Sequence, residues 1–510
     1  MSNQAPKAGD FKLSTRIFLA SYQSETGKSE PLRINIAEAV QEIHIFEGIN
    51  YDTLSGSLVI VDAGGLLDRL PLTGNEQLEF TLHTPGFTLE DDISRGYDFV
   101  TYPMWVSKIR NINAPNQNAK VYVLDFFSKE RIKSNQRKIS RAFTGPIFRS
   151  VQSVIRNYLK TQKDFYYETT SPTVKYVIPN KSPLETIKFL GTEAISEKFE
   201  NSGFYFWETS DGFNFKSLEA MISNSSGKSK EPVAEYTNAP KSDSGQMYRA
   251  KDGQNVIKGN LEKVFEFNIL KRFDTLENIK QGTYASRLVT YDAFTKRFKN
   301  VDFSYPHEYT KSNHMGQEQT PDSPFTGIMP VYKYEGDKLL SDFPNAKRMF
   351  TTSTIGMHDV KVTIPADRVG GTDTTRIEAI DTADVENTLQ KSLAQKNAFN
   401  SFMIELVVPG NTAVTAGSVI KFSTLTENIR DDKPETKIDP FLSGNYLVTE
   451  VRHLAQNTPQ GIHTMTLTCA KDSVGVEYLP NDKEVLNTDV LAKGSDYNQF
   501  DIEEVWIIIL

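Results

Sequence analysis

The sequence repeats a block of three β-type segments, and this repeat limits the folds that the chain can adopt. The first copy consists of "EQLEFTL", "YPMWVSKIRN" and "AKVYVLDFFSKE", and the second of "GSVIKF", "NYLVTEVRHL" and "HTMTLTCAKDS". One offset of 342 residues carries Phe80 onto Phe422 and Arg110 onto Arg452. Apolar and polar residues alternate in both copies, as they do in half-buried strands. The sequence therefore predicts two similar β-domains. The same offset pairs Phe99 with Phe441, Val106 with Val448, Ser107 with Thr449, Ile109 with Val451, Lys129 with Lys471 and Glu130 with Asp472.

A doubled domain has a consequence for symmetry. Homo-oligomers favour closed point groups. Three copies of a chain with two similar domains would present six similar units around one axis. The repeat thus suits an assembly that joins a sixfold object to a threefold one.

The composition is that of a folded, β-rich protein. The 510 residues suffice for two to four domains, and 31 Phe and 21 Tyr favour strand packing. A formal net charge of −8 argues against a nucleic-acid binder that acts through a broad basic surface. The single cysteine, Cys469, excludes an intrachain disulfide, and the alternating "TMTLTCAKD" around it predicts a buried strand thiol rather than a reactive one.

The ends and the hydropathy bear on the compartment. The first residues, "MSNQAPKAGDFKLS", contain no apolar core of a signal peptide. No run approaches the ~20 apolar residues that span a bilayer. We therefore expect no membrane span and folding in a cytoplasm.

No catalytic motif occurs in the sequence. The P-loop, nucleophile-elbow, HExxH and CxxC patterns are all absent. His453 and His463 fall on segments expected to be adjacent strands, where they are either polar strand residues or metal ligands, and no third ligand is marked. We expect no catalytic residue, no cofactor and no bound metal.

Two segments carry clear local structural signals. The run Ser182-Pro183-Leu184-Glu185 has the residues of a capping box, with proline at the first helical position, so it predicts a helix start. The run "FYFWETSDGFNFKSL" predicts a hairpin that turns at Ser210-Asp211-Gly212. Its aromatic residues serve either as core packing or as a ligand platform.

Two further segments are candidates for contacts with partners. The basic run "SKERIKSNQRKISRAF" is either a solvated face or a contact for an acidic neighbouring subunit, with candidate residues Arg131, Lys133, Arg137 and Lys138. The final "VWIIIL" is an aggregation hazard if it is exposed. It either folds back as a last strand or, as we favour, adds a strand to a neighbour or fills a partner's groove. The candidate interface residues are Val505, Trp506, Ile507, Ile508, Ile509 and Leu510.

Three segments together resemble a known family. They are "SGFYFWETSDGFNFKSLE", "YASRLVTYDAFTKRFKNVDFSY" and, later, "GNYLVTEVRH" followed by "HTMTLTCAKDS". In this order they resemble the baseplate hub proteins of T-even-like contractile-tailed bacteriophages and, more distantly, the hub part of type VI secretion spike proteins. The resemblance extends over about residues 11–475.

The resemblance implies a structural role. It implies a homotrimeric ring in which two tube-type β-barrels per chain mimic the tail-tube subunit, so that the ring adapts a sixfold tail tube to a threefold central spike. The implied partners are the tail tube protein, the central spike protein and other baseplate subunits, and DNA passes through the lumen without specific binding. The implied location is the tail baseplate of the virion, assembled in the host cytoplasm, and an enzyme is not expected. The alternatives are a tail-associated cell-wall hydrolase and a carbohydrate-binding receptor module, the latter predicting exposed Tyr205 and Trp207.

The predicted fold class is a β-rich α+β protein with two similar tube-type β-barrel domains and inserted α/β domains. The first barrel is expected at 11–127 and the second at 351–475. A helix and hairpin domain is expected at 128–221, and a linker with an inserted β-rich region at 222–350. A C-terminal extension with an apolar end occupies 476–510.

Overall fold

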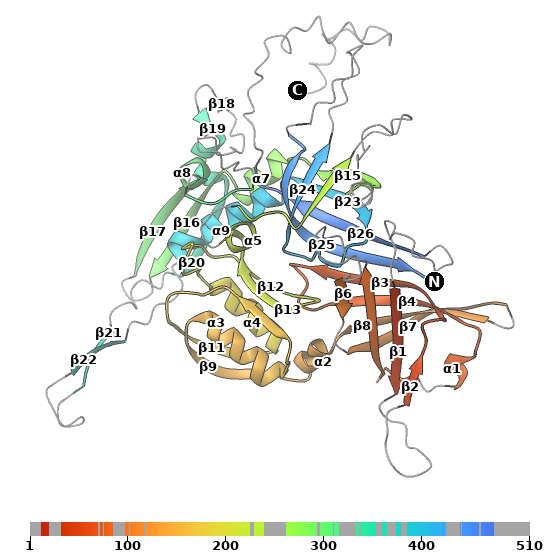
Figure 1. The fold of residues 1–510 in the computed structure, drawn as a ribbon. Helices are drawn as coiled ribbons and strands as arrows, with labels where there is room; N and C mark the ends of the chain where they lie inside the picture. Colours follow the sequence, from red (N-terminus) through yellow and green to blue (C-terminus); the bar gives the residue numbers. More distant parts are fainter. Residues whose placement is uncertain are drawn as a thin grey trace, which may run out of the picture.

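The computed structural model describes most of the chain between residues 12 and 473. Within the described ranges, fourteen strands form one continuous sheet. Figure 1 shows this sheet passing through two neighbouring groups of strands, one red to orange and one green to blue, with helices α3, α4 and α9 on one side. The described ranges are 12–19, 32–69, 72–74, 76–84, 97–100, 103–116, 119–224, 229–238, 262–292, 296–309, 311–315, 333–335, 338–352, 360–364, 374–378, 385–424, 439, 441–457 and 461–473.

The first half of the sheet is a circuit of strands in the order β2-β1-β5-β7-β8-β4-β3, with β6 paired to β5. Residues 36–39 lead from β2 into β3 and bond to both β1 and β4. The amide of Ile36 donates to the carbonyl of Thr15 in β1 at 3.2 Å, and the amide of Val61 in β4 donates to Ala39 at 2.8 Å. The bounds are β1 (Lys12–Leu19), β2 (Leu32–Asn35), β3 (Val40–Gly48), β4 (Ser55–Asp62), α1 (Leu66–Arg69), β5 (Gln77–Thr84), β6 (Tyr97–Val100), β7 (Met104–Asn116) and β8 (Ala119–Ser128).

The second half is also a circuit, in the order β14-β24-β25-β26-β23-β15. The residues before β15 bond to β14: the amide of Thr237 in β14 donates to the carbonyl of Glu262 at 2.7 Å, and the amide of Val264 donates to the carbonyl of Thr237 at 3.1 Å. The bounds are β14 (Ala234–Asn238), β15 (Glu266–Lys271), β23 (Met403–Pro409), β24 (Val419–Thr424), β25 (Gly444–Gln456) and β26 (Ile462–Ala470).

The two circuits share one order, both along the chain and in space. In that order β14 matches β1, residue 262 to the end of β15 matches β2 and β3, and β23, β24, β25 and β26 match β4, β5, β7 and β8. One strand differs in direction: β1 is antiparallel to β5, whereas β14 is parallel to β24. The repeat predicted from the sequence is therefore present, and it is larger than the three segments that revealed it.

A β-bulge recurs at the same place in both halves. The pairing of β7 with β8 shifts after Val106, and that of β25 with β26 shifts after Val448. The hydroxyl of Ser107 donates to the carbonyl of Asp125, and that of Thr449 to Thr468, each at 3.0 Å. The side chain satisfies a carbonyl beside the disrupted pairing.

The single offset of 342 is wrong in the last strand of the repeat. Phe126 pairs with Val106, and Cys469 pairs with Val448, so the offset there is one residue larger. The reason is an extra residue between the paired positions of the second hairpin, which moves every later match by one. Ser128, not Lys129, therefore corresponds to Lys471, and the predicted match of Glu130 with Asp472 is likewise displaced.

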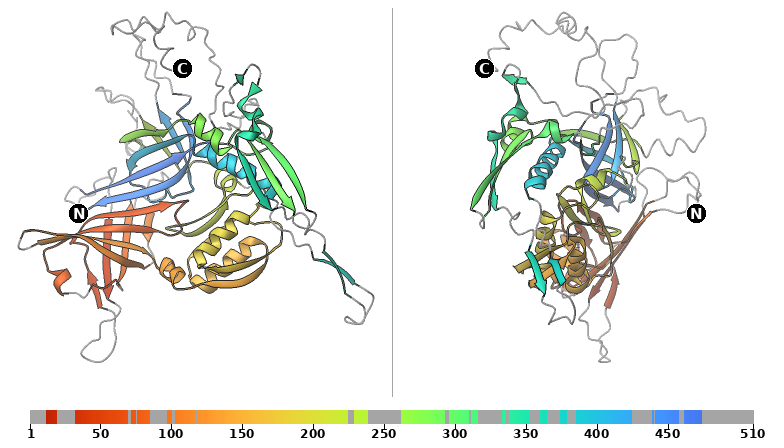
Figure 2. Two further views of the ribbon diagram at one scale, coloured as in Figure 1. Left: turned by 180° about the vertical axis from the view of Figure 1, so that it is seen from behind. Right: turned by 90° about the vertical axis from the view of Figure 1, so that its left-hand side faces the viewer.

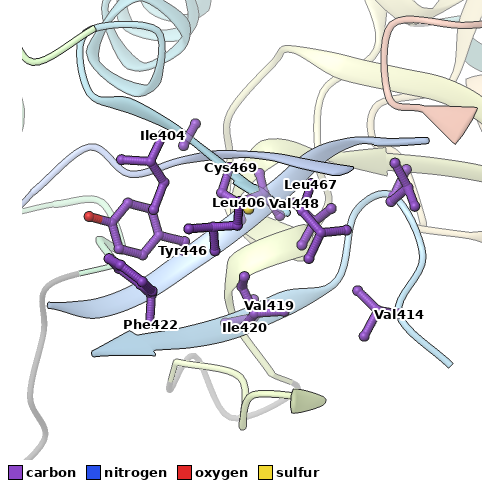
Figure 3. Close-up of a cluster of buried hydrophobic side chains, with 14 of the residues drawn as sticks. Ile404, Leu406, Val414, Val419, Ile420, Phe422, Tyr446, Val448, Leu467 and Cys469 are labelled. Atoms are coloured by element: carbon purple, nitrogen blue, oxygen red, sulfur yellow. The ribbon is translucent and has the colours of Figure 1, made fainter. Parts of the chain in front are cut away.

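Each circuit has its own apolar core. Phe80 and Phe422, matched by the repeat, are both buried. Phe80 packs edge-on against Phe126, with ring centroids 5.3 Å apart, and Phe422 packs against Phe267 at 5.1 Å. Figure 3 shows the second core, in which Phe422, Tyr446, Ile404 and Cys469 converge between the strands. Cys469 is fully buried, as the sequence predicted.

A helical layer follows the first circuit. The predicted helix start is confirmed: the amide of Glu185 donates to the Ser182 hydroxyl at 3.4 Å, and that of Ser182 to the Glu185 carboxylate at 2.8 Å. The predicted hairpin is also confirmed and turns through Gly212 at φ 147. The bounds are α2 (Lys129–Asn135), β9 (Ile139–Gly145), α3 (Ile147–Ser153), a π-helix (Val154–Leu159), β10 (Asp164–Tyr167), β11 (Val174–Lys181), α4 (Pro183–Glu193), β12 (Phe204–Thr209), β13 (Gly212–Ser217) and α5 (Leu218–Ile222).

A second group of elements is inserted between β15 and β23. Its helix α9 packs on the sheet β17-β16-β20, and Figure 2 shows α9 and this sheet beside the second circuit. The predicted division at 222–350 and 351–475 does not follow this pairing, because β14 and β15 belong to the second circuit although they precede the insertion. The bounds are α7 (Thr275–Gln281), β16 (Ala285–Asp292), β17 (Arg297–Ser304), α8 (Tyr305–Tyr309), β18 (Lys333–Glu335), β19 (Lys338–Leu339), β20 (Arg348–Thr352), β21 (Val360–Ile364), β22 (Thr374–Glu378) and α9 (Val385–Phe399), with short 3-10 turns at Leu340–Asp342 and Pro344–Ala346.

Candidate assembly site

The two circuits are joined by backbone pairing between β25 and β3. The register runs from Glu450 opposite Gly48 to Gln456 opposite Glu42. The early residues of β25 pair with β24 and the later ones with β3, so this one strand serves both halves. The sequence had not predicted that β3 lies beside the second copy.

Side chains reinforce the β25–β3 junction. The guanidinium of Arg452 lies 5.9 Å from the ring centroid of Phe46, and its Nη2 lies 3.3 Å from Nδ1 of His44. Burial, together with the charge of Arg452, lowers the pKa of His44. A neutral His44 can accept the hydrogen bond that Arg452 donates. Gln456 also donates to Glu42 at 3.0 Å.

A buried ionic cluster fixes the helical layer to the first circuit. The Lys163 ammonium contacts the Glu130 carboxylate at 2.9 Å, the Ser128 hydroxyl at 2.8 Å, and the Glu208 carboxylate. Glu208 also accepts a hydrogen bond from the amide of Leu54 at 3.0 Å. The cluster thus links β8, α2, β12 and the loop before β4.

The protonation states of this cluster follow from burial and attraction. Burial alone would lower the pKa of Lys163, but the two carboxylates outweigh it and the pKa is raised. Burial raises the pKa of Glu208, with partial compensation by Lys163. Burial opposes ionisation of Glu130 as well, but Lys163 and hydrogen bonds lower its pKa overall. Lys163 therefore remains charged and Glu130 carries the principal negative charge.

Glu47, near the end of β3, lies where three parts of the molecule meet. Its carboxyl accepts a hydrogen bond from the amide of Ala416, in the second circuit, at 3.3 Å. Burial, helped by the nearby Asp211 in the β12–β13 hairpin, raises the pKa of Glu47 to about 8, although a hydrogen bond from the amide of Ala416 opposes this shift. Glu47 is therefore mostly a neutral acid at pH 7.

The aromatic hairpin is packed against the second circuit. Trp207 is 2% exposed, and its indole nitrogen donates to the carbonyl of Ala416 at 3.0 Å. Tyr205 is half-buried at the edge of the second core. The burial of Trp207 contradicts the exposure that a carbohydrate-binding receptor module required, and it agrees with core packing.

A cleft of about 540 Å³ lies between α4, α9 and the loop after β3. Its wall is largely apolar and includes Ile187, Phe204 and Leu389. Lys188 of α4 and Asp52 of the loop form a 2.8 Å ion pair beside it. The apolar wall suits packing against an apolar group better than proton transfer.

The two strand histidines lie on neighbouring strands, as the sequence predicted. Nδ1 of His453 and Nε2 of His463 are 3.2 Å apart in the β25–β26 pair. Burial lowers the pKa of His453 to about 4, so the ring is neutral near pH 7. Among the described residues, no group of three or more His, Cys, Asp or Glu side chains could hold a metal ion.

The basic residues predicted as a partner contact lie on or just after α2. Lys133 donates to the carbonyl of Lys160 at 3.1 Å, and Arg137 donates to Tyr158 at 2.5 Å. These two side chains therefore bind carbonyls at the end of the π-helix. Arg131 and Lys138 are exposed, and Lys138 lies 3.5 Å from the Glu185 carboxylate. The partner contact remains a prediction.

The other predicted interface, Val505 to Leu510, lies outside the described residues. In the described part of the chain, no helix is both long and apolar enough to cross a membrane.

Comparison with known proteins finds similar solved structures but no family model and no curated relative. The structure is similar to a tail protein from Neisseria meningitidis MC58 (9% identity, 91% of this chain and 97% of that chain, TM-score 0.47) and to the 43 kDa tail protein of prophage MuSo2 from Shewanella oneidensis (7%, 90% and 98%, 0.45). It is also similar to the c3393 protein of E. coli, a component of the type VI secretion system (9% identity, 86% of this chain and 76% of that chain, TM-score 0.37). The first two are tail proteins, and the third is a secretion component with structural similarity to bacteriophage tail proteins.

Proposed function

We propose that the protein is the structural hub of a phage tail baseplate. In this proposal it forms a homotrimeric ring that adapts the sixfold tail tube to the threefold central spike and lets DNA pass through its lumen. The observation that carries the proposal is the doubled circuit, with one strand order used twice in one chain. Three copies would then supply six equivalent β units.

Each circuit is proposed to be a tube-type β-barrel. The hydrogen bonds of residues 36–39, and those between Thr237 and residues 262–264, support closure of both circuits. The second barrel would draw on 234–238, 262–271 and 403–473, and the helical layer and the insertion would contact the spike and other baseplate subunits. The net charge of −8 is compatible with a lumen that DNA crosses without specific binding.

The location and the chemistry follow from the same proposal. The protein would reside in the tail of the virion, at the baseplate, after assembly in the host cytoplasm. Its function would be symmetry matching without turnover. Arg131 and Lys138, together with the final six residues, are its proposed contacts with tube, spike or neighbouring subunits.

The test is the mass and shape of the full chain in solution. Light scattering after size exclusion should give three times 57.5 kDa, and negative stain should show a ring with six lobes. Co-expression with a spike protein from the same genome provides the second arm. A particle that stays monomeric in both arms, or a ring with another number of chains, would contradict the hub.

A further inference from the structure

The pairing of β25 with β3 suggests how the two strands that match them in the repeat could pair with another chain. It pairs a long strand of one circuit with the third strand of the other circuit. The matched strands are β7, which corresponds to β25, and β15, which corresponds to β3. On the side opposite β8, β7 pairs with β5 up to Trp105, and the amide of Val106 donates to Glu76 just before β5; no described strand lies beside β7 after Val106. Among the described strands, β15 has only β23 beside its six residues.

β15 is more exposed to solvent than the matched strand β3. Ile45 in β3 pairs with Gly56, and the matched Ile269 in β15 pairs with Ile404. Ile45 is 0% exposed in the core of the first circuit, on a strand that β25 covers, whereas Ile269 is 44% exposed on a strand with no such neighbour in the described part of the chain. An edge strand that exposes apolar residues such as Ile269 and Leu270 is a template for pairing with another chain.

The later residues of β7 are likewise more exposed than the matched residues of β25. His453 and Ala455 of β25 are buried beneath the junction with β3. At the corresponding level of β7, residues 111–113 are exposed, and Ile112 is 55% exposed. In the junction, β25 and β3 pair with each other, whereas their matched strands, β7 after Val106 and β15, each leave one edge without a described strand beside it.

The two uncovered strands also carry matching insertions. Between the levels of Arg452 and Leu454, β25 has one residue, while β7 has two, Asn111 and Ile112. Between the matched levels of Phe46 and His44, β3 has one residue, while β15 has two, Leu270 and Ile269. Each extra residue forms a bulge in the pairing within one chain, of β7 with β8 and of β15 with β23. If β7 and β15 were paired with each other, both would have two residues between the matched levels, so the register would be continuous.

We propose that β7 of one copy pairs antiparallel with β15 of a second copy of this chain. The template gives the register: Arg110 opposite Lys271, Ile112 opposite Ile269, and Asn113 opposite Asn268. The two exposed isoleucines meet across the pair, where apolar cross-strand neighbours stabilise a sheet. The charge of Arg110 is already paired with Asp125 at 2.8 Å.

The contact is head-to-tail, because each copy offers one β7 and one β15. Such contacts generate closed rings when the rotation closes. The strand pairing continues the fourteen-stranded sheet from one copy into the next. The proposal rests on the proposed function only for the number of copies in the ring, which is three there.

A pair of cysteines tests the register directly. Ile112→Cys with Ile269→Cys should form disulfides between chains under mild oxidation at high protein concentration, because directly opposed residues lie within disulfide range. The matched control is Ile112→Cys with Glu266→Cys, which lies three residues away, roughly 10 Å along the strand. The native Cys469 is fully buried and does not compete.

The outcomes on a non-reducing gel separate the possibilities. Covalent multimers in the first variant and not in the control support the interface. An intrachain disulfide, equal linking in the control, or the absence of linked chains overturns it. Oligomers that form without linking would overturn this interface and leave the hub intact, whereas linked rings of another size would support the interface and contradict the trimer.

Introducing a charge at the interface, and then an opposite charge facing it, provides an independent test by light scattering. Ile112→Glu should weaken association about tenfold or more, since it places a charge in an apolar strand contact. Adding Ile269→Lys should restore most of it, because opposite charges then face each other. Val177→Glu, at a 70% exposed strand position in β11, is the matched control and should change nothing. Association that is indifferent to Ile112→Glu, or unrestored by the second change, overturns the proposal.

Discussion

The two circuits reach the same strand order by different routes. In the first, β3 leads to β4 through residues 49–54, whereas in the second, β15 leads to β23 through an insertion from 272 to 402. The matched strands β1 and β14 even run in opposite directions. What both circuits keep is the set of core-facing positions and the bulge at Ser107 and Thr449. Connections lie outside the core and tolerate change, so the burial pattern rather than the path of the chain defines the repeated unit.

The strongest way to break this comparison is to remove a matched core side chain. Phe80→Ala and Phe422→Ala should each lower the free energy of unfolding by about 3–5 kcal/mol, because both rings are buried and packed against another ring. Chemical denaturation of each variant measures the loss. A negligible effect at either site would show that the two cores are not equivalent.

The ionic cluster around Lys163 joins the helical layer to the first circuit and has no counterpart described at the second, so its removal should act mainly on that contact. Lys163→Met leaves the buried Glu130 and Glu208 without their cation and should destabilise the protein by about 3 kcal/mol. Thermal unfolding with hydrogen exchange measures the size and place of the effect. Lys138→Met removes a lysine from an exposed 3.5 Å pair and should be nearly neutral. Exchange that rises in the second core alone would contradict this assignment.

Glu47 gives the junction a pH dependence. Its pKa is about 8 in the folded chain, above the ordinary value of about 4.5, so the folded state holds a proton that the unfolded state releases. Stability from this group is complete below about pH 4.5 and falls as the pH rises toward 8, by up to about 1.4 kcal/mol per unit. Glu47→Gln should match the parent at pH 4.5 and exceed it at pH 8. Parallel pH profiles of parent and variant would be incompatible with a buried neutral acid.

The smallest effect on folding is expected at the end of the chain. Deleting Val505 to Leu510 should change the unfolding free energy by less than about 0.5 kcal/mol, if these residues contact a partner rather than a core. Binding to the co-expressed tail partners should weaken. A large fall in melting temperature of the isolated protein would instead identify the segment as part of a folded core.

The sequence predicted those parts of the fold that depend on local pattern. The alternation in β5, β7, β8 and their counterparts, the capping box at Ser182 and the turn at Gly212 are all local signals, and each was confirmed. The sequence did not reveal that the offset increases by one in β26, because "HTMTLTCAKDS" can be aligned with the first copy in either of two registers, and only the strand pairing decides between them.

The parts that the sequence did not predict depend on distant contacts. β14 and β15 are short, and β15 shows no alternation of burial, since one of its sides is uncovered. Lys163 stands in a polar stretch without any pattern. Glu208 does carry a signal, because it continues the two-residue spacing of Phe204 and Phe206 and so introduces a charge on a packed face.

The shared strand β25 makes the two circuits a single mechanical element. Its residues from Glu450 to Gln456 are bonded to β26 on one side and to β3 on the other. A load along the strand would be carried by all of these hydrogen bonds at once, whereas a load that peels β3 away would break them one after another. The direction of pull, more than the number of bonds, would therefore decide whether the two halves move together or part.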